Sequence, residues 1–151
     1  ADVVLRITNN PPDYLFGRKL IDLKYAVYAS EELVNQIGMD APYEDYPWIH
    51  HTEKMQSDWM DLWFKKNAPN ASISFRVDSA VTARQAVESG IGVHFLPSAY
   101  AKLKPNLVRI GSEVGEVSLW FLTHPDLKTN GRVKAFSDFM FKELSANNLR
   151  Q

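Results

Sequence analysis

The sequence predicts an α/β fold, and residues 73–97 are the clearest indication. Residues 73–77 have the pattern of a strand, Asp78 or Ser79 can cap a following helix, and Gly90 can end that helix. The apolar residues 91–96 then predict a second strand, which stops at Pro97. We expect these two strands to form one βαβ unit and to lie parallel, with the N-terminus of the helix at the carboxyl end of the first strand. Free N–H groups at such a corner suit an anionic or polar ligand.

Strands alternate with helices along the rest of the chain, which favours a mainly parallel sheet covered on both faces. The first helix, residues 31–37, has Ser30 as its cap, an acidic first turn and Gly38 after its end. Apolar residues spaced three and four apart predict the last helix. The expected strands are residues 3–8, 24–29, 47–51, 73–77, 91–96, 107–110 and 117–123, and the other expected helices are residues 58–67, the segment that ends at Gly90, 98–103 and 132–146.

Composition narrows the class of protein. The 151 residues contain 45% apolar and 12% aromatic side chains, which is enough for a hydrophobic core. The chain has 17 Lys and Arg against 18 Asp and Glu. It therefore lacks the excess of basic residues that is typical of a nucleic-acid-binding chain. Cysteine is absent, which fits a reducing compartment and excludes disulfide or thiolate chemistry. No apolar run approaches the roughly 20 residues needed to span a bilayer, and we expect no membrane partner.

The chain begins with A-D-V-V-L-R-I, inside a predicted strand and without an initiator methionine. Natural chains seldom begin within a core element. We therefore expect a fragment of a longer protein that is cut at or near Ala1.

Nothing in the sequence predicts catalysis, a cofactor or a metal site. There is no G-x-S-x-G motif, and the glycines at 90 and 92 follow a helix instead of opening one. His50, His51 and Glu53 are metal-ligating types, but adjacent histidines on a strand are expected to point to opposite faces. We therefore expect no enzyme, no cofactor and no metal.

Two features have both a structural and a functional interpretation. Asp78 and Ser79 can simply cap a helix, worth about 1 kcal/mol, or can line a ligand cleft at a strand end. Arg6 lies in the apolar strand V-V-L-R-I and needs a carboxylate, a ligand or water. An anion-binding role is plausible because a guanidinium group pairs with carboxylates in a bidentate way, and a salt bridge or solvent is the alternative. The tryptophans are expected in the core or at a lobe interface: Trp48, Trp59, Trp63 and Trp120.

Several segments, in their order along the chain, resemble the effector-binding domain of LysR-type transcriptional regulators. The family shows a strand of the type D-V-V-L-R near its middle, followed by a strand that ends in A-S and a helix, as L-I-D-L-K-Y-A-V-Y-A-S does here. Further similarity lies at residues 77–79, 86–92, 96–97 and 132–140. The resemblance covers essentially the whole chain, and the order of the motifs makes it specific.

This resemblance implies a fold like the type II periplasmic binding proteins, in which two α/β lobes flank a cleft. Residues 18–120 would form lobe II, and residues 1–17 and 121–151 the remainder of lobe I. The winged helix-turn-helix and the first part of lobe I would be missing from this chain. DNA contacts would come only through that absent winged helix-turn-helix.

The resemblance also implies a ligand site and a function. Arg6 and Thr8 would contribute from lobe I, and His51, Thr52, Asp78, Ser79 and Ala80 from lobe II. We expect the ligand-sensing part of a cytoplasmic bacterial regulator, in which a small, anionic effector acts allosterically on a homo-oligomer, either a dimer or a tetramer. The alternative is an exported solute-binding protein of the same fold that serves a transport system.

Overall fold

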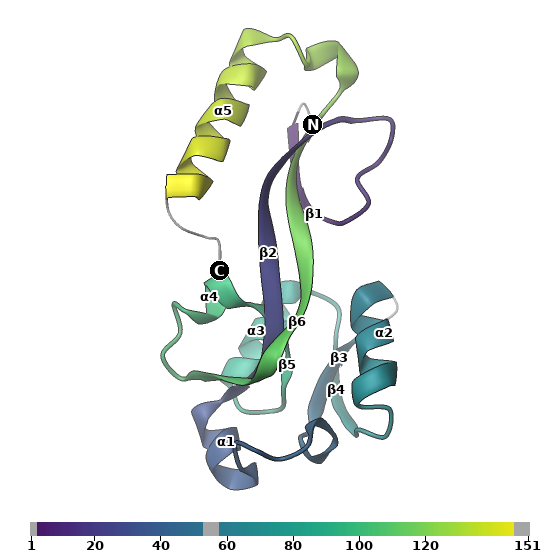
Figure 1. Ribbon diagram of the computed structural model, residues 1–151, viewed down its shortest axis with the longest axis vertical. Helices are drawn as coiled ribbons and strands as arrows, with labels where there is room; N and C mark the ends of the chain where they lie inside the picture. Colours follow the sequence, from purple (N-terminus) through teal and green to yellow (C-terminus); the bar gives the residue numbers. More distant parts are fainter. Residues whose placement is uncertain (1–2, 53–57, 147–151) are drawn as a thin grey trace. The chain divides into compact units, whose positions relative to one another are not determined.

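The computed structural model describes residues 3–52 and 58–146, and the chain divides into two compact units (Figure 1). Unit 1 consists of Ala1–Lys24 and Glu116–Gln151, and unit 2 of Tyr25–Gly115. The elements in chain order are β1 (Val3–Ile7), β2 (Phe16–Ser30), α1 (Glu31–Ile37), the 3-10 helix η1 (Tyr43–Asp45), β3 (Trp48–His51), α2 (Asp58–Asn67), β4 (Ile73–Val77), α3 (Ala80–Glu88), β5 (His94–Pro97), α4 (Ser98–Ala101), β6 (Leu107–Thr123), the 3-10 helix η3 (Pro125–Leu127) and α5 (Gly131–Ala146).

Two long strands, β2 and β6, each contain residues of both units, and they are neighbours in a four-stranded sheet of order β1-β6-β2-β5. The chain therefore passes between the units twice. The lobe boundaries expected from the sequence, after residues 17 and 120, fall on these same two strands and stay a prediction.

In unit 1, β1 pairs antiparallel with the end of β6, with Val3 opposite Thr123 and Ile7 opposite Leu119. The Arg18 guanidinium of β2 binds the Asp138 carboxylate of α5 at 2.7 Å and lies 4.3 Å from the centre of the Phe141 ring. The predicted first strand and last helix are both confirmed, each within a residue or two.

Two strands are longer than the sequence predicts. The second strand was expected over residues 24–29, but β2 begins at Phe16. Its polar half is held by distant partners: the Ser118 hydroxyl donates to the Asp22 carboxylate at 2.6 Å and lowers the pKa of that carboxyl. The expected strands 107–110 and 117–123 are one continuous strand, β6, because Gly111 and Gly115 lie within the strand instead of ending it.

In unit 2, β3 pairs in parallel with β4, and Trp48 of β3 forms a parallel bridge with Val93. Strand β3 thus lies between strands 73–77 and 91–96 and is parallel to both, to the second through the bridge at Val93. The expectation of a mainly parallel sheet is wrong, since β5 pairs antiparallel with β2, as β1 does with β6.

The helices of unit 2 follow their capping signals. The Leu33 N–H donates to the Ser30 hydroxyl at 3.1 Å at the start of α1, and the Gly38 N–H donates to the Val34 carbonyl at its end. The fourth helix is shorter than expected and ends at Ala101. Helix α3 packs on the sheet through a core of Ala26, Tyr28, Ile49, Val77, Ala83, Ala86, Val87, Leu96 and Ala101.

No helix in the described ranges is long and apolar enough to cross a membrane.

Candidate functional site

The carboxyl ends of β3 and β4 lie next to each other in unit 2. His51 is opposite Val77 in the parallel register, and the Thr52 N–H donates to the Val77 carbonyl at 2.8 Å. The residues that follow β4 are Asp78 and Ser79, which lead directly into α3. Five of the seven expected ligand-binding residues therefore come from one edge of unit 2: His51, Thr52, Asp78, Ser79 and Ala80.

Ser79 is the cap of α3. Its hydroxyl accepts the Thr82 N–H at 3.1 Å, and its carbonyl accepts the Ala83 N–H at 3.0 Å. The capping role is therefore confirmed for Ser79 and not for Asp78, whose side chain is exposed. The first N–H groups of a helix have no partner within the helix, which is why helix N-termini commonly bind anions.

The other two expected residues, Arg6 and Thr8, lie in unit 1. The Thr8 hydroxyl accepts the Asn10 N–H at 3.0 Å, which gives it a local role in the turn after β1. The Arg6 side chain is exposed and has no ion pair or hydrogen bond with another described residue. Among those residues, nothing supports the salt-bridge alternative for Arg6.

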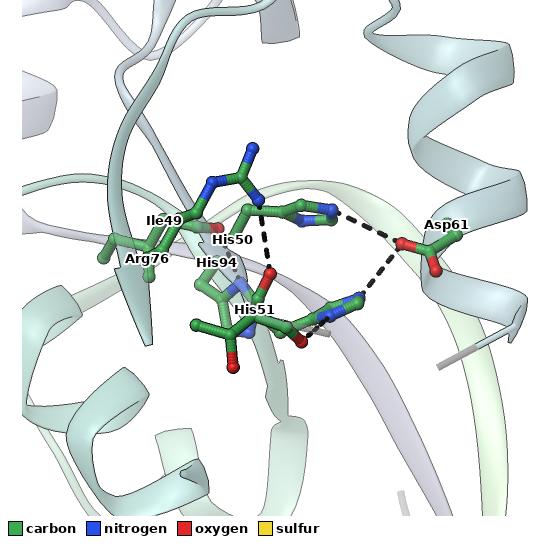
Figure 2. Close-up of polar contacts among 7 residues, drawn as sticks. Ile49, His50, His51, Asp61, Arg76 and His94 are labelled. Carbon is green, nitrogen blue, oxygen red and sulfur yellow. Dashed lines mark hydrogen bonds and ion pairs between the residues drawn. The ribbon is translucent and has the colours of Figure 1, made fainter. Parts of the chain in front are cut away.

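A cluster of His50, His51 and Asp61 occupies the end of β3 (Figure 2). The Asp61 Oδ1 of α2 lies 3.3 Å from His50 Nε2 and 3.0 Å from His51 Nε2. The two imidazole rings are 4.4 Å apart, so the expectation that they point to opposite faces is wrong. His50 and His51 are the last two residues of β3, and the rings of both turn towards the same Asp61 carboxylate of α2. Glu53, considered with them, lies outside the described residues.

The surroundings of the cluster favour neutral His50. Burial, followed by the charge of His51, lowers the pKa of His50, while Asp61 acts in the opposite direction. His50 Nδ1 is buried without a partner among the described residues, and so is the Thr52 hydroxyl. Sequence reasoning missed Asp61, because a contact across ten residues and two different elements leaves no recognisable spacing in the sequence.

His94 of β5 is a neutral core residue beside this cluster. Its Nδ1–H donates to the Ile49 carbonyl at 2.9 Å (Figure 2). Burial, opposed by that hydrogen bond and assisted by His50 and His51, lowers the pKa of His94 from 6.5 to about 4. Because the unfolded chain takes up this proton near pH 6.5 and the folded chain does not, stability is lost as the pH falls from about 6.5 towards 4.

We therefore expect His94 to contribute a slope of about 1.4 kcal/mol per pH unit near pH 5–6, and about 3 kcal/mol in total. Urea unfolding at several pH values measures this slope. The variant His94→Asn keeps a donor near the Nδ1 position and should flatten the slope, whereas His124→Gln, which changes an exposed histidine, should not. An equally steep slope in His94→Asn would assign the acid sensitivity to other groups.

The chain is thus an α/β domain of two units, with polar groups at strand carboxyl ends, the place where open α/β sheets commonly bind ligands. The family model "LysR substrate binding domain" matches residues 1–145, and the chain belongs to that family. This family is the effector-binding domain of LysR-type transcriptional regulators, with a type II periplasmic-binding-protein-like fold, and it is not a family of enzymes. The resemblance and fold predicted from the sequence are thus confirmed.

Solved structures show the same fold. The CrgA regulatory domain of the LysR-type regulator from Neisseria meningitidis is 21% identical, with a TM-score of 0.78 over 95% of this chain and 75% of that chain. The effector domain of AmpR from Pseudomonas aeruginosa is 18% identical, with a TM-score of 0.77 over 97% and 73%. The longer CrgA structure from Neisseria meningitidis is 22% identical, with a TM-score of 0.77, and the chain covers 52% of it. None of the curated proteins compared with the chain matches it.

Proposed function

We propose that this chain is the ligand-sensing part of a bacterial LysR-type regulator and binds a small anionic metabolite in a cleft between its two units. Arg6 and Thr8 would contribute from one unit. His51, Thr52 and the start of α3, namely Asp78, Ser79 and Ala80, would contribute from the other.

The observation that carries this proposal is the edge of unit 2 at which β3 and β4 end. The Thr52 N–H to Val77 carbonyl bond holds the two strand ends together, and Ser79 begins α3 at that place. Free backbone N–H groups and the positive end of the helix dipole favour a carboxylate or phosphate there. Asp78 has an exposed carboxylate, which would accept a hydrogen bond from a hydroxyl or amino group of the same ligand.

The anionic character of the ligand is supported by Arg6. Its guanidinium is exposed and has no partner among the residues that the structure describes. A planar guanidinium matches a carboxylate through two parallel hydrogen bonds.

The regulatory mechanism would be allosteric. Ligand binding would shift the balance between two arrangements of the units, and a homo-oligomer in the cytoplasm would transmit that shift to DNA-binding winged helix-turn-helix domains supplied outside this chain. The family match favours this function over the transport alternative.

The test is a thermal-shift screen of the chain against small carboxylates and phosphates. A ligand at about 100 times its Kd adds about 2.7 kcal/mol to the free energy of unfolding. For a chain of this size, that raises Tm by about 5–10 °C. Arg6→Ala should abolish the shift, because it removes the group that pairs with the anion.

The matched control is Arg132→Ala, which removes another exposed arginine of unit 1 and should leave the shift unchanged. A shift of equal size in Arg6→Ala would remove Arg6 from the site. The absence of a shift with every anion would contradict the anionic ligand.

A further inference from the structure

We propose that His50, His51 and Asp61 form a binding site for one divalent transition-metal ion of the Zn²⁺ type. This inference does not rest on the proposed function, because it concerns three side chains that meet within unit 2 whatever effector the chain binds.

The first argument is the convergence of the ligand atoms. One ring nitrogen of His50, one of His51 and an Asp61 oxygen all lie within 4.8 Å of one another. Zn²⁺ binds nitrogen and carboxylate oxygen at about 2.0–2.2 Å, so neighbouring ligand atoms of a tetrahedral ion lie roughly 3.3–3.4 Å apart. The two measured separations, 3.3 Å from His50 and 3.0 Å from His51 to Asp61 Oδ1, are close to that value. A small outward movement of α2 would admit the ion.

The second argument is the tautomer of His51. Its Nδ1 lies 2.9 Å from the Thr52 carbonyl, which can only accept, so Nδ1 carries the hydrogen. In the neutral ring, the Nε2 lone pair then faces the Asp61 carboxylate, which is also an acceptor, at 3.0 Å. Two lone pairs in contact require a cation between them, either a proton or a metal ion. A backbone carbonyl on the far nitrogen is the usual way to orient a metal-binding histidine.

The third argument is that the ligands are held in place while the site stays accessible. His51 and His50 are largely buried, with 6% and 15% of their side chains exposed, whereas Asp61 is 39% exposed. The His51 carbonyl accepts a bond from Arg76 at 3.3 Å, which fixes the end of β3 (Figure 2). The positive charge of Arg76 would repel a bound cation. The negative charge of the Asp61 carboxylate, which would contact the ion directly, offsets this repulsion.

The donor set selects the class of metal. Two imidazoles and one carboxylate suit Zn²⁺, Co²⁺ or Ni²⁺ and leave at least one position open for water or another ligand. A hard ion such as Mg²⁺ requires an octahedral set of oxygens, which this cluster lacks. Binding would tie α2 to the end of β3.

The experiment is isothermal titration calorimetry of the chelator-treated 151-residue chain with Zn²⁺, and with Mg²⁺ for comparison. We expect one Zn²⁺ per chain and no binding of Mg²⁺. Asp61→Asn should weaken Zn²⁺ binding by at least about tenfold. Replacing a residue that only supports a metal ligand already lowers affinity by about that factor, and Asp61 is itself a ligand in this site. Because asparagine can still hydrogen-bond to the histidines, this variant should keep its fold, which circular dichroism checks without metal.

His51→Gln is the second variant and should also weaken Zn²⁺ binding. The matched control is His124→Gln, which removes an exposed histidine of unit 1 and should bind Zn²⁺ as the parent chain does. The absorption spectrum of the Co²⁺-loaded chain provides an independent readout of nitrogen coordination and should be lost in Asp61→Asn.

Three results would overturn the proposal. The first is that the parent chain binds no Zn²⁺, which would leave only a hydrogen-bonded pair between His51 and Asp61. The second is that Asp61→Asn and His51→Gln both bind Zn²⁺ as the parent chain does, and the third is that His124→Gln loses Zn²⁺ binding. Anion binding through Arg6 is measured separately and without metal, so the failure of either proposal is distinguishable from the failure of the other.

Discussion

Replacing Val87 by aspartate is expected to unfold unit 2. Val87 lies on α3 with none of its surface exposed, inside the core that joins the helix to the sheet. An aspartate there has no cationic partner, and an uncompensated buried charge costs at least about 3–5 kcal/mol. Because a domain has only about 5–15 kcal/mol of stability, this change removes much or all of it. Urea unfolding followed by circular dichroism measures the loss.

The control for this prediction is on the same helix. Val81 is 52% exposed near the N-terminus of α3, where an aspartate also interacts favourably with the helix dipole. Val81→Asp should therefore change the free energy of unfolding by less than about 1 kcal/mol. A soluble Val87→Asp chain that unfolds cooperatively at the parent urea concentration would contradict the packing of this helix face.

Trp48→Ala is expected to have the second-largest effect. Trp48 of β3 is fully buried, its indole N–H donates to the Tyr43 carbonyl at 2.8 Å, and its ring packs against four others, of which Tyr43 is the most distant at 6.4 Å between ring centres. The centres of the Trp63, Phe64 and Phe95 rings lie 5.7, 5.1 and 5.4 Å away. Removing such a side chain leaves a cavity and costs about 3–5 kcal/mol.

A conservative variant separates packing from hydrogen bonding. Trp48→Phe keeps most of the ring but leaves the Tyr43 carbonyl without its donor, so we expect a loss of about 1–3 kcal/mol. Leu62→Ala, at a site on α2 that is 68% exposed, should cost less than about 0.5 kcal/mol. If Trp48→Ala were as mild as Leu62→Ala, the aromatic cluster would contribute little to the stability of unit 2.

The helices were predictable because their signals are local. Ser30 and Ser79 each accept an N–H three residues ahead, and Gly38 and Gly90 follow their helices with φ angles of +111° and +81°, which favour glycine. These contacts lie within a few residues, so the sequence contains both partners side by side.

The strands were less predictable because their partners are remote. The charged half of β2 has the sequence pattern of a loop. In the folded chain it is part of a strand because Arg18 binds Asp138 and Asp22 binds Ser118, each about a hundred residues away in sequence. Gly115 resembles a turn residue, yet it is within β6, and a Cβ there would lie 2.6 Å from the Trp59 ring. A glycine that permits close packing cannot be distinguished by sequence alone from a glycine that ends a strand.

The candidate site shows the same division. The sequence indicated the strand-to-helix corner at Asp78 and Ser79, and its order of motifs identified the family. It did not indicate Asp61, and it predicted the wrong orientation for the pair His50 and His51.

The sequence by itself thus determined the family, the positions of the capped helices and the polar corner at the start of α3, since all of these depend on short-range patterns. The tertiary structure alone decided which strands are neighbours, how far β2 and β6 extend, and that two histidines and Asp61 meet. The physical reason is that strand pairing and side-chain clusters are formed by contacts between residues far apart in the chain, for which no local pattern exists.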